Sequence, residues 1–124
     1  NAWALCKSPR NLMDDQIDRI GDSSGIIGLN FHVGFLREDG DHANTDTPLE
    51  RIVEHGRYIA DRIGVEHLGL GSDFDGAKMP DALGDAAGLP KLTEAFSEAG
   101  FCSEEIQAIC MDNWLRVLGK TWKE

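Results

Sequence analysis

The sequence has 124 residues, 41% of them hydrophobic and 27% charged, and its 22 acidic and 12 basic residues give a formal net charge of −10. This charge argues against nucleic acid or an anionic membrane surface as a partner. No apolar run approaches the roughly 18 residues of a membrane span, so no membrane contact is expected. Three cysteines without zinc-binding or disulfide spacing favour a reducing compartment such as the cytoplasm. Cys102 and Cys110 have apolar neighbours and are expected to be core thiols.

The first part of the chain predicts a helix, a strand and a long loop. The helix covers residues 13–21 and carries acidic residues in its first turn, where the helix dipole favours them. Residues 25–31 form an apolar run interrupted by glycines, which predicts a buried strand, and His32 follows at its end. Residues 33–46 are polar and predict a lid or binding loop.

A second, longer helix is predicted to begin near Thr47. Thr47 can cap this helix, and Glu50 completes a capping box. Apolar residues recur at helical spacing as far as Ile63, and Gly64 is expected to end the helix. His55 is expected on the polar side of the helix.

The residues from Leu68 to Gly76 predict the functional edge of a sheet. A short apolar run ends there in Asp73 and Asp75, as in a buried parallel strand that delivers carboxylates to its carboxyl end. If strand geometry continues, the two carboxylates point to the same side. Together with the preceding strand and helix, this strand predicts a right-handed βαβ unit. The alternative is an Asp-rich turn whose carboxylates cap backbone amides.

The last third of the chain predicts three helices. One covers residues 89–99, one is capped by Ser103, and one restarts at Asn113. The residues expected to face inward on the last two are Ile106, Ile109, Cys110, Trp114, Leu115, Val117 and Leu118. Two strands cannot bury both faces of a sheet, so the pattern predicts part of a larger α/β protein.

The four histidines and Arg10 are candidate site residues. No histidine pairs at His-x-His, His-x-x-x-His or His-x-x-Glu spacing, so the residues themselves predict no metal site. His32 could contact a ligand, although packing is favoured; His42 is expected to be solvated, and His67 to hydrogen-bond at the start of its strand. Arg10 could clamp a carboxylate with two hydrogen bonds, or it could be an ordinary surface arginine.

Two other functions are considered. The segment Asp73-Phe74-Asp75-Gly76 after a strand resembles the Asp-x-Asp-Gly-Thr nucleophile motif of haloacid-dehalogenase-type phosphatases, with Asp73 as the nucleophile. However, Ala77 replaces the threonine, and the motif lies in the middle of the chain rather than near its start. A non-catalytic acidic binding module is the third interpretation.

Several motifs together resemble the C-terminal portion of the membrane (renal) dipeptidase family of zinc metallopeptidases. They occur in the family's order and spacing and cover essentially the whole chain, and the Gly-Ser-Asp-Phe-Asp-Gly element is specific. The matching segments are Ser8-Pro9-Arg10-Asn11-Leu12 with Asp14, Gly25 to Phe31, Gly69 to Gly76, Leu89-Pro90, and Asp112 to Val117.

The resemblance implies an α/β fold that forms the C-terminal part of a (β/α)8 TIM-like barrel, with its last two strands plus helices. It implies hydrolysis of dipeptides by a hydroxide that bridges two zinc ions (Zn2+). Arg10 matches the family's substrate-binding arginine. Asp73 matches the aspartate that contacts the substrate and handles the proton of the leaving amine. His32 is expected on the substrate side, and Asp75 and Gly76 in supporting roles.

The family's metal ligands would all lie upstream of Asn1, in an early His-x-Asp, a mid-barrel glutamate and two later histidines. Residues 1–124 are therefore expected to be a fragment of one barrel domain that supplies substrate-binding residues but no metal ligands and is inactive alone. The expected partner is a dipeptide substrate; family members often form homodimers, but no residue here indicates one.

Overall fold

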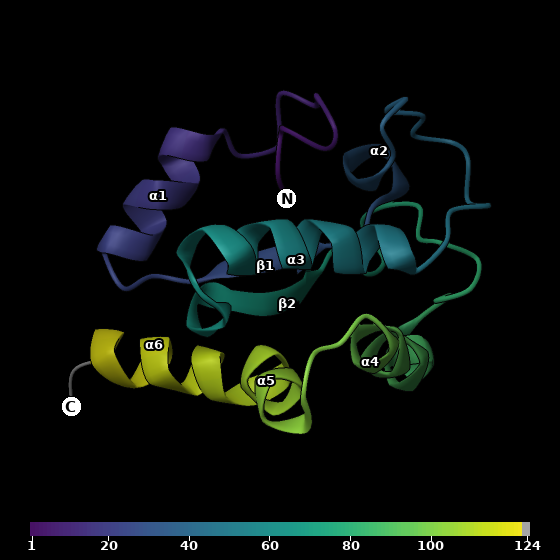
Figure 1. The fold of residues 1–124 in the computed structure, drawn as a ribbon. Coiled ribbons are helices and arrows are strands. Elements are labelled where there is room, and N and C mark those ends of the chain that lie inside the picture. The colour runs from purple at the N-terminus through teal and green to yellow at the C-terminus, as the bar shows by residue number, and fades with distance from the viewer. Residues whose placement is uncertain (123–124) are drawn as a thin grey trace.

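The computed structural model describes residues 1–122 and is built on two parallel strands, β1 (Ile27–Asn30) and β2 (Leu68–Ser72). The long helix α3 (Glu50–Ile63) connects them, so the predicted βαβ arrangement is confirmed (Figure 1). The helix ends at Gly64, whose φ of +100° suits glycine, and a 3-10 turn over Val65–His67 leads into β2.

One face of the strand pair is covered by α3. Helix α4 (Leu89–Glu98), which follows a 3-10 turn over Ala86–Gly88, packs against α3. Helix α1 (Asp14–Asp22) also packs against α3. Each fully buried aliphatic or aromatic side chain in the core contributes about 1.5–3 kcal/mol of burial free energy. The largest of these side chains are Ile17, Leu29, Phe31, Leu36, Ile52, Ile59, Leu68, Leu92, Phe96 and Ile109.

The amino ends of both strands are closed by the C-terminal helices. Helix α5 (Ser103–Gln107), a π-helical turn (Ala108–Asp112) and α6 (Asn113–Thr121) run on as one continuous segment (Figure 1). The buried amide of Asn113 donates hydrogen bonds to the carbonyls of Val65 and Leu68, 2.9 and 2.8 Å away. The carboxyl ends of the strands lie opposite these helices.

Two expectations about the segment between β1 and α3 were wrong. The predicted loop begins with a short helix, α2 (Val33–Leu36), which is too short to show a helical period in the sequence. Thr47 does not cap α3: its hydroxyl donates to the carbonyl of Asn44 and accepts a hydrogen bond from Arg37. The residue before the helix is Leu49, with no side-chain cap.

His55 is fully buried rather than on a polar face. Its Nδ1 accepts a hydrogen bond from the backbone N–H of Ala2 (3.1 Å), so its Nε2 carries the proton and donates to the carbonyl of Leu36 (3.1 Å). Burial lowers the pKa of His55 from 6.5 to about 4. His55 therefore joins α3 to the N-terminal segment as a neutral imidazole.

Several expectations about the last helices were also wrong. Cys102 and Cys110 are exposed, and it is Cys6 that is buried. Cys102, not Ser103, precedes the first residue of α5. Leu115 faces outward, and the residue is 58% exposed. Among residues 1–122, no helix combines the length and apolarity needed to cross a membrane.

Candidate functional site

The backbone turns sharply where β2 ends. Ser72, Asp73 and Asp75 have φ values of +57°, +78° and +64°, a region that non-glycine residues seldom occupy. Strand geometry therefore does not continue, and Asp73 is partly buried while Asp75 is exposed. Such conformations persist where surrounding contacts hold them, and they cluster at functional sites.

Asn30, at the end of β1, connects the two strand ends. Its Nδ2 donates to Oδ2 of Asp73 over 3.0 Å, and its Oδ1 accepts the backbone N–H of His32 over 2.8 Å. One asparagine thereby contacts both Asp73 and His32, the two predicted site residues at this edge.

The segment that carries Arg10 is tied to the same edge through Asn1 and Asn11. The amide of Asn1 bonds both the N–H and the carbonyl of Asn30, each over 2.9 Å. The amide of Asn11 donates to the carbonyl of Phe35 over 3.0 Å. The Arg10 guanidinium is exposed and lies 5.8 Å from the centre of the Phe35 ring, a cation–π arrangement.

His32 and His42 form a hydrogen-bonded pair beside Phe35. Nδ1 of His32 lies 3.0 Å from the carbonyl of Lys78, and its Nε2 lies 2.8 Å from Nδ1 of His42. A carbonyl can only accept, so a neutral His32 carries its proton on Nδ1 and accepts one from His42. The His32 and Phe35 rings meet edge to face, 4.8 Å between centres.

The structure thus brings the predicted site residues to one edge in different ways. Asp73 and His32 are joined through Asn30, and Arg10 reaches His32 through the Phe35 ring. Both nitrogens of the His32 ring have partners, which fits packing. His42 is exposed, as expected, but it is also hydrogen-bonded. His67 bonds the carbonyl of Gly25 (2.8 Å), as predicted.

Sequence reasoning missed Asn1, Asn30 and His42 as parts of this edge. Asparagine is common in turns that follow an apolar strand. The only feature of the sequence that could have indicated a functional role for Asn30 is its position at the end of a strand. Asn1 and His42 are far from Asn30 and His32 along the chain, and no local pattern connects them.

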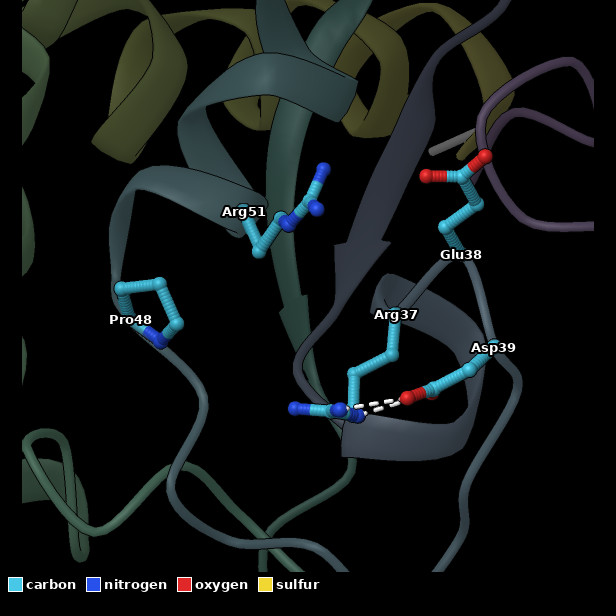
Figure 2. A pocket seen from close by; sticks show the side chains of 5 residues that line it. All are labelled: Arg37, Glu38, Asp39, Pro48 and Arg51. Atoms are coloured by element: carbon cyan, nitrogen blue, oxygen red, sulfur yellow. Dashed lines mark hydrogen bonds and ion pairs between the residues drawn. The ribbon is translucent and has the colours of Figure 1, made fainter.

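Several cavities lie near this end of the molecule. One cavity, of about 450 Å³, is lined by residues between Phe74 and Ala86, in the segment that comes directly after Asp73 in the chain. Another of about 400 Å³ is lined by Arg37, Glu38, Asp39, Pro48 and Arg51 (Figure 2). In Figure 2 the Arg37 guanidinium faces the Asp39 carboxylate, and this pair lowers the pKa of Asp39 to about 2. The cavity in Figure 2 includes none of the predicted site residues.

The donor atoms of residues 1–122 do not gather into a metal centre. In this part of the chain, no three His, Cys, Asp or Glu side chains come close enough together to hold a metal ion. The facing nitrogens of His32 and His42 are hydrogen-bonded to each other. The described residues therefore do not fit a metal centre by themselves.

Comparison with known proteins identifies relatives across the chain. It is 47% identical over 124 residues to an uncharacterized protein in the pqqA 5′ region of Klebsiella pneumoniae, covering all of this chain and 45% of that protein. It is 36% identical over 121 residues to dipeptidase tcpJ of Claviceps purpurea, covering 95% of this chain and 27% of the relative.

The fold matches that of a solved metallopeptidase from Rhodobacter sphaeroides, liganded with a phosphinate mimic of the dipeptide L-Ala-D-Ala. The TM-score is 0.95 at 41% identity, over 98% of this chain and 34% of that one. The sequence and structural similarities show that the chain has an α/β fold that matches part of a metallopeptidase. The family model for membrane dipeptidase (peptidase family M19) matches residues 1–123, and the chain belongs to this family. It spans less than half the length of these relatives.

Proposed function

We propose that this sequence forms the C-terminal part of a (β/α)8 barrel in a metal-dependent dipeptidase, with β1 and β2 as the last two strands. The family match supports this assignment over the phosphatase and binding-module interpretations. The observation that carries it is structural: the segments of Arg10 and Asp73 meet at the carboxyl edge of the strands, where barrel enzymes place their chemistry.

Arg10 is proposed to bind the carboxylate of the dipeptide. Among residues 1–122, no carboxylate lies within ion-pair distance of its guanidinium, which leaves its charge available. The Phe35 ring beside it limits where the guanidinium can lie. A planar guanidinium can hold a carboxylate with two parallel hydrogen bonds.

Asp73 is proposed to contact the substrate and to carry the proton of the leaving amine. Its carboxyl group takes a proton from the attacking water and delivers it to the amine nitrogen as the carbon–nitrogen bond breaks. The role of His32 in substrate binding stays a prediction, because a substrate would have to replace one of its present partners.

The family implies a metal cofactor, and we propose two zinc ions held by residues of the whole enzyme outside the described ones. The proposed roles of Arg10 and Asp73 come from the family resemblance and are supported by the contacts described above. A homodimer of the whole enzyme and a reducing compartment also stay predictions.

The test uses the complete enzyme that contains this sequence, with L-Ala-D-Ala as substrate. Arg10→Met should raise KM by about tenfold or more, since one charge-assisted pair is lost. Asp73→Asn should lower kcat by about 10²–10⁴-fold with an unchanged metal content.

Two exposed residues of α1, changed as Arg19→Met and Asp22→Asn, provide matched controls and should leave both constants unchanged. Full activity of the Asp73→Asn enzyme would overturn the assignment. So would hydrolysis of phosphomonoesters, but not dipeptides, by the wild-type enzyme.

A further inference from the structure

The orientation of the Asn30 side chain follows from its partners. The backbone N–H of His32 can only donate, so the atom of Asn30 that it meets at 2.8 Å is the oxygen. The NH2 group then faces the Asp73 carboxylate, with Nδ2 3.0 Å from Oδ2. In the opposite amide orientation, the NH2 group of Asn30 would face the N–H of His32, and its oxygen would face the Asp73 carboxylate. Neither contact could be a hydrogen bond.

This contact gives the two carboxylate oxygens of Asp73 different surroundings. Oδ2 is engaged by the amide of Asn30, while Oδ1 faces Gly76. A side chain at position 76 would place its Cβ only 2.7 Å from Oδ1. The glycine therefore keeps the surroundings of Oδ1 clear.

We propose that Asn30 is the positioning residue for Asp73 and that Oδ1 of Asp73 is the atom that carries the transferred proton; this rests on the function proposed above. With Oδ2 held by a donor, the proton from the attacking water goes to Oδ1. It leaves Oδ1 for the amine nitrogen as the carbon–nitrogen bond breaks, and the carboxylate is restored. Asn30 keeps its own protons throughout.

The placement of Asn30 is itself secured by Asn1. The Asn1 amide bonds the N–H and the carbonyl of Asn30, and the carbonyl of Asn1 accepts the N–H of Leu12. The segment that carries Arg10 and the residue that orients Asp73 are thus held by one residue, Asn1, through its backbone carbonyl and its side-chain amide. Asp73 has an unusual backbone conformation, with φ of +78°, and these contacts fix the direction of its carboxyl group.

The test compares two variants of Asn30 in the complete enzyme. Asn30→Asp keeps the acceptor for His32 but replaces the donor with a second carboxylate. We expect a kcat at least tenfold lower, a KM within about twofold, and an acidic limb of the kcat–pH profile displaced to higher pH, because adjacent carboxylates resist joint ionisation. Asn30→Ser keeps a short local acceptor but cannot reach Asp73, and it should lower kcat with a smaller displacement of that limb.

Asn113→Asp is the matched control. It removes an amide donor that is more deeply buried than that of Asn30, but at the amino ends of the strands, so it should leave kcat and the pH profile unchanged. If Asp73→Asn lowers kcat while both Asn30 variants keep wild-type kcat and pH profile, the inference fails and the proposed function stands. If Asp73→Asn is fully active, the proposed function itself fails. Should Asn30→Asp not fold, Asn30→Ser alone decides through its kcat.

Discussion

The buried imidazole of His55 should make the protein lose stability in mild acid. Burial lowers its pKa from 6.5 to about 4, with a smaller contribution from the charge of Arg51, while the Leu36 carbonyl opposes the shift. The unfolded chain therefore takes up a proton between these pH values and the folded chain does not. Stability is full above pH 6.5 and falls as the pH drops to about 4.

The size of the effect follows from the same shift. One pKa unit corresponds to about 1.36 kcal/mol, so His55 accounts for about 3 kcal/mol between neutral pH and pH 4. In a folded domain with a typical unfolding free energy of about 5–15 kcal/mol this is a substantial loss. Urea unfolding of the complete protein at pH 7, 6 and 5 measures it as a falling midpoint.

His55→Gln provides the comparison. The variant loses stability at every pH because its contacts with Ala2 and Leu36 change, but its midpoint should depend less on pH than that of the wild type. Nuclear magnetic resonance gives a direct check, with the His55 ring signals assigned by their absence in the variant. A His55 ring that titrates near pH 6.5 in the folded protein would refute the argument.

Two further predictions concern the strand edge and the thiols. Gly76→Ala should lower kcat by about tenfold or more, measured with L-Ala-D-Ala, because its Cβ would meet Oδ1 of Asp73 at 2.7 Å; unchanged kcat would show that Oδ1 has room to move. Cys102 and Cys110 should react with a thiol reagent in the folded protein, as read by mass spectrometry of labelled peptides, with Cys110 slower because partial burial raises its pKa. Cys6 should react only after unfolding, since burial raises its pKa and its thiol contacts the carbonyl of Gly34.

The regular elements could be predicted where the hydrophobic period was long or where glycine marked an end. Helix α3 and strand β2 were found this way, and Gly64 separates them as expected. For His55 the same pattern gave a wrong prediction. His55 lies three residues after Ile52 and four before Ile59, on the apolar side of the helix, but it was assigned to the polar side because histidine is a polar residue.

The site could be predicted only in part, because its construction depends on distant contacts. Asp73 stood out through its place after a strand, and Arg10 through the family resemblance. The contact between Asn30 and Asp73 spans the two strands and leaves no spacing in the sequence. The direction of the Asp73 carboxylate also depends on a backbone conformation that local propensity disfavours, which no hydrophobic pattern encodes.

The bond between Asn1 and the Asn30 backbone also limits how β1 can pair on its outer side. Phe31 donates its N–H to Ser72 of the other strand, so the peptide groups of the preceding residue point away from β2. The Asn1 side chain occupies both of those groups, in the place that a neighbouring strand's peptide would take. A strand added along this edge must therefore end its ladder before Asn30, so it stops short of the level where Asp73 lies.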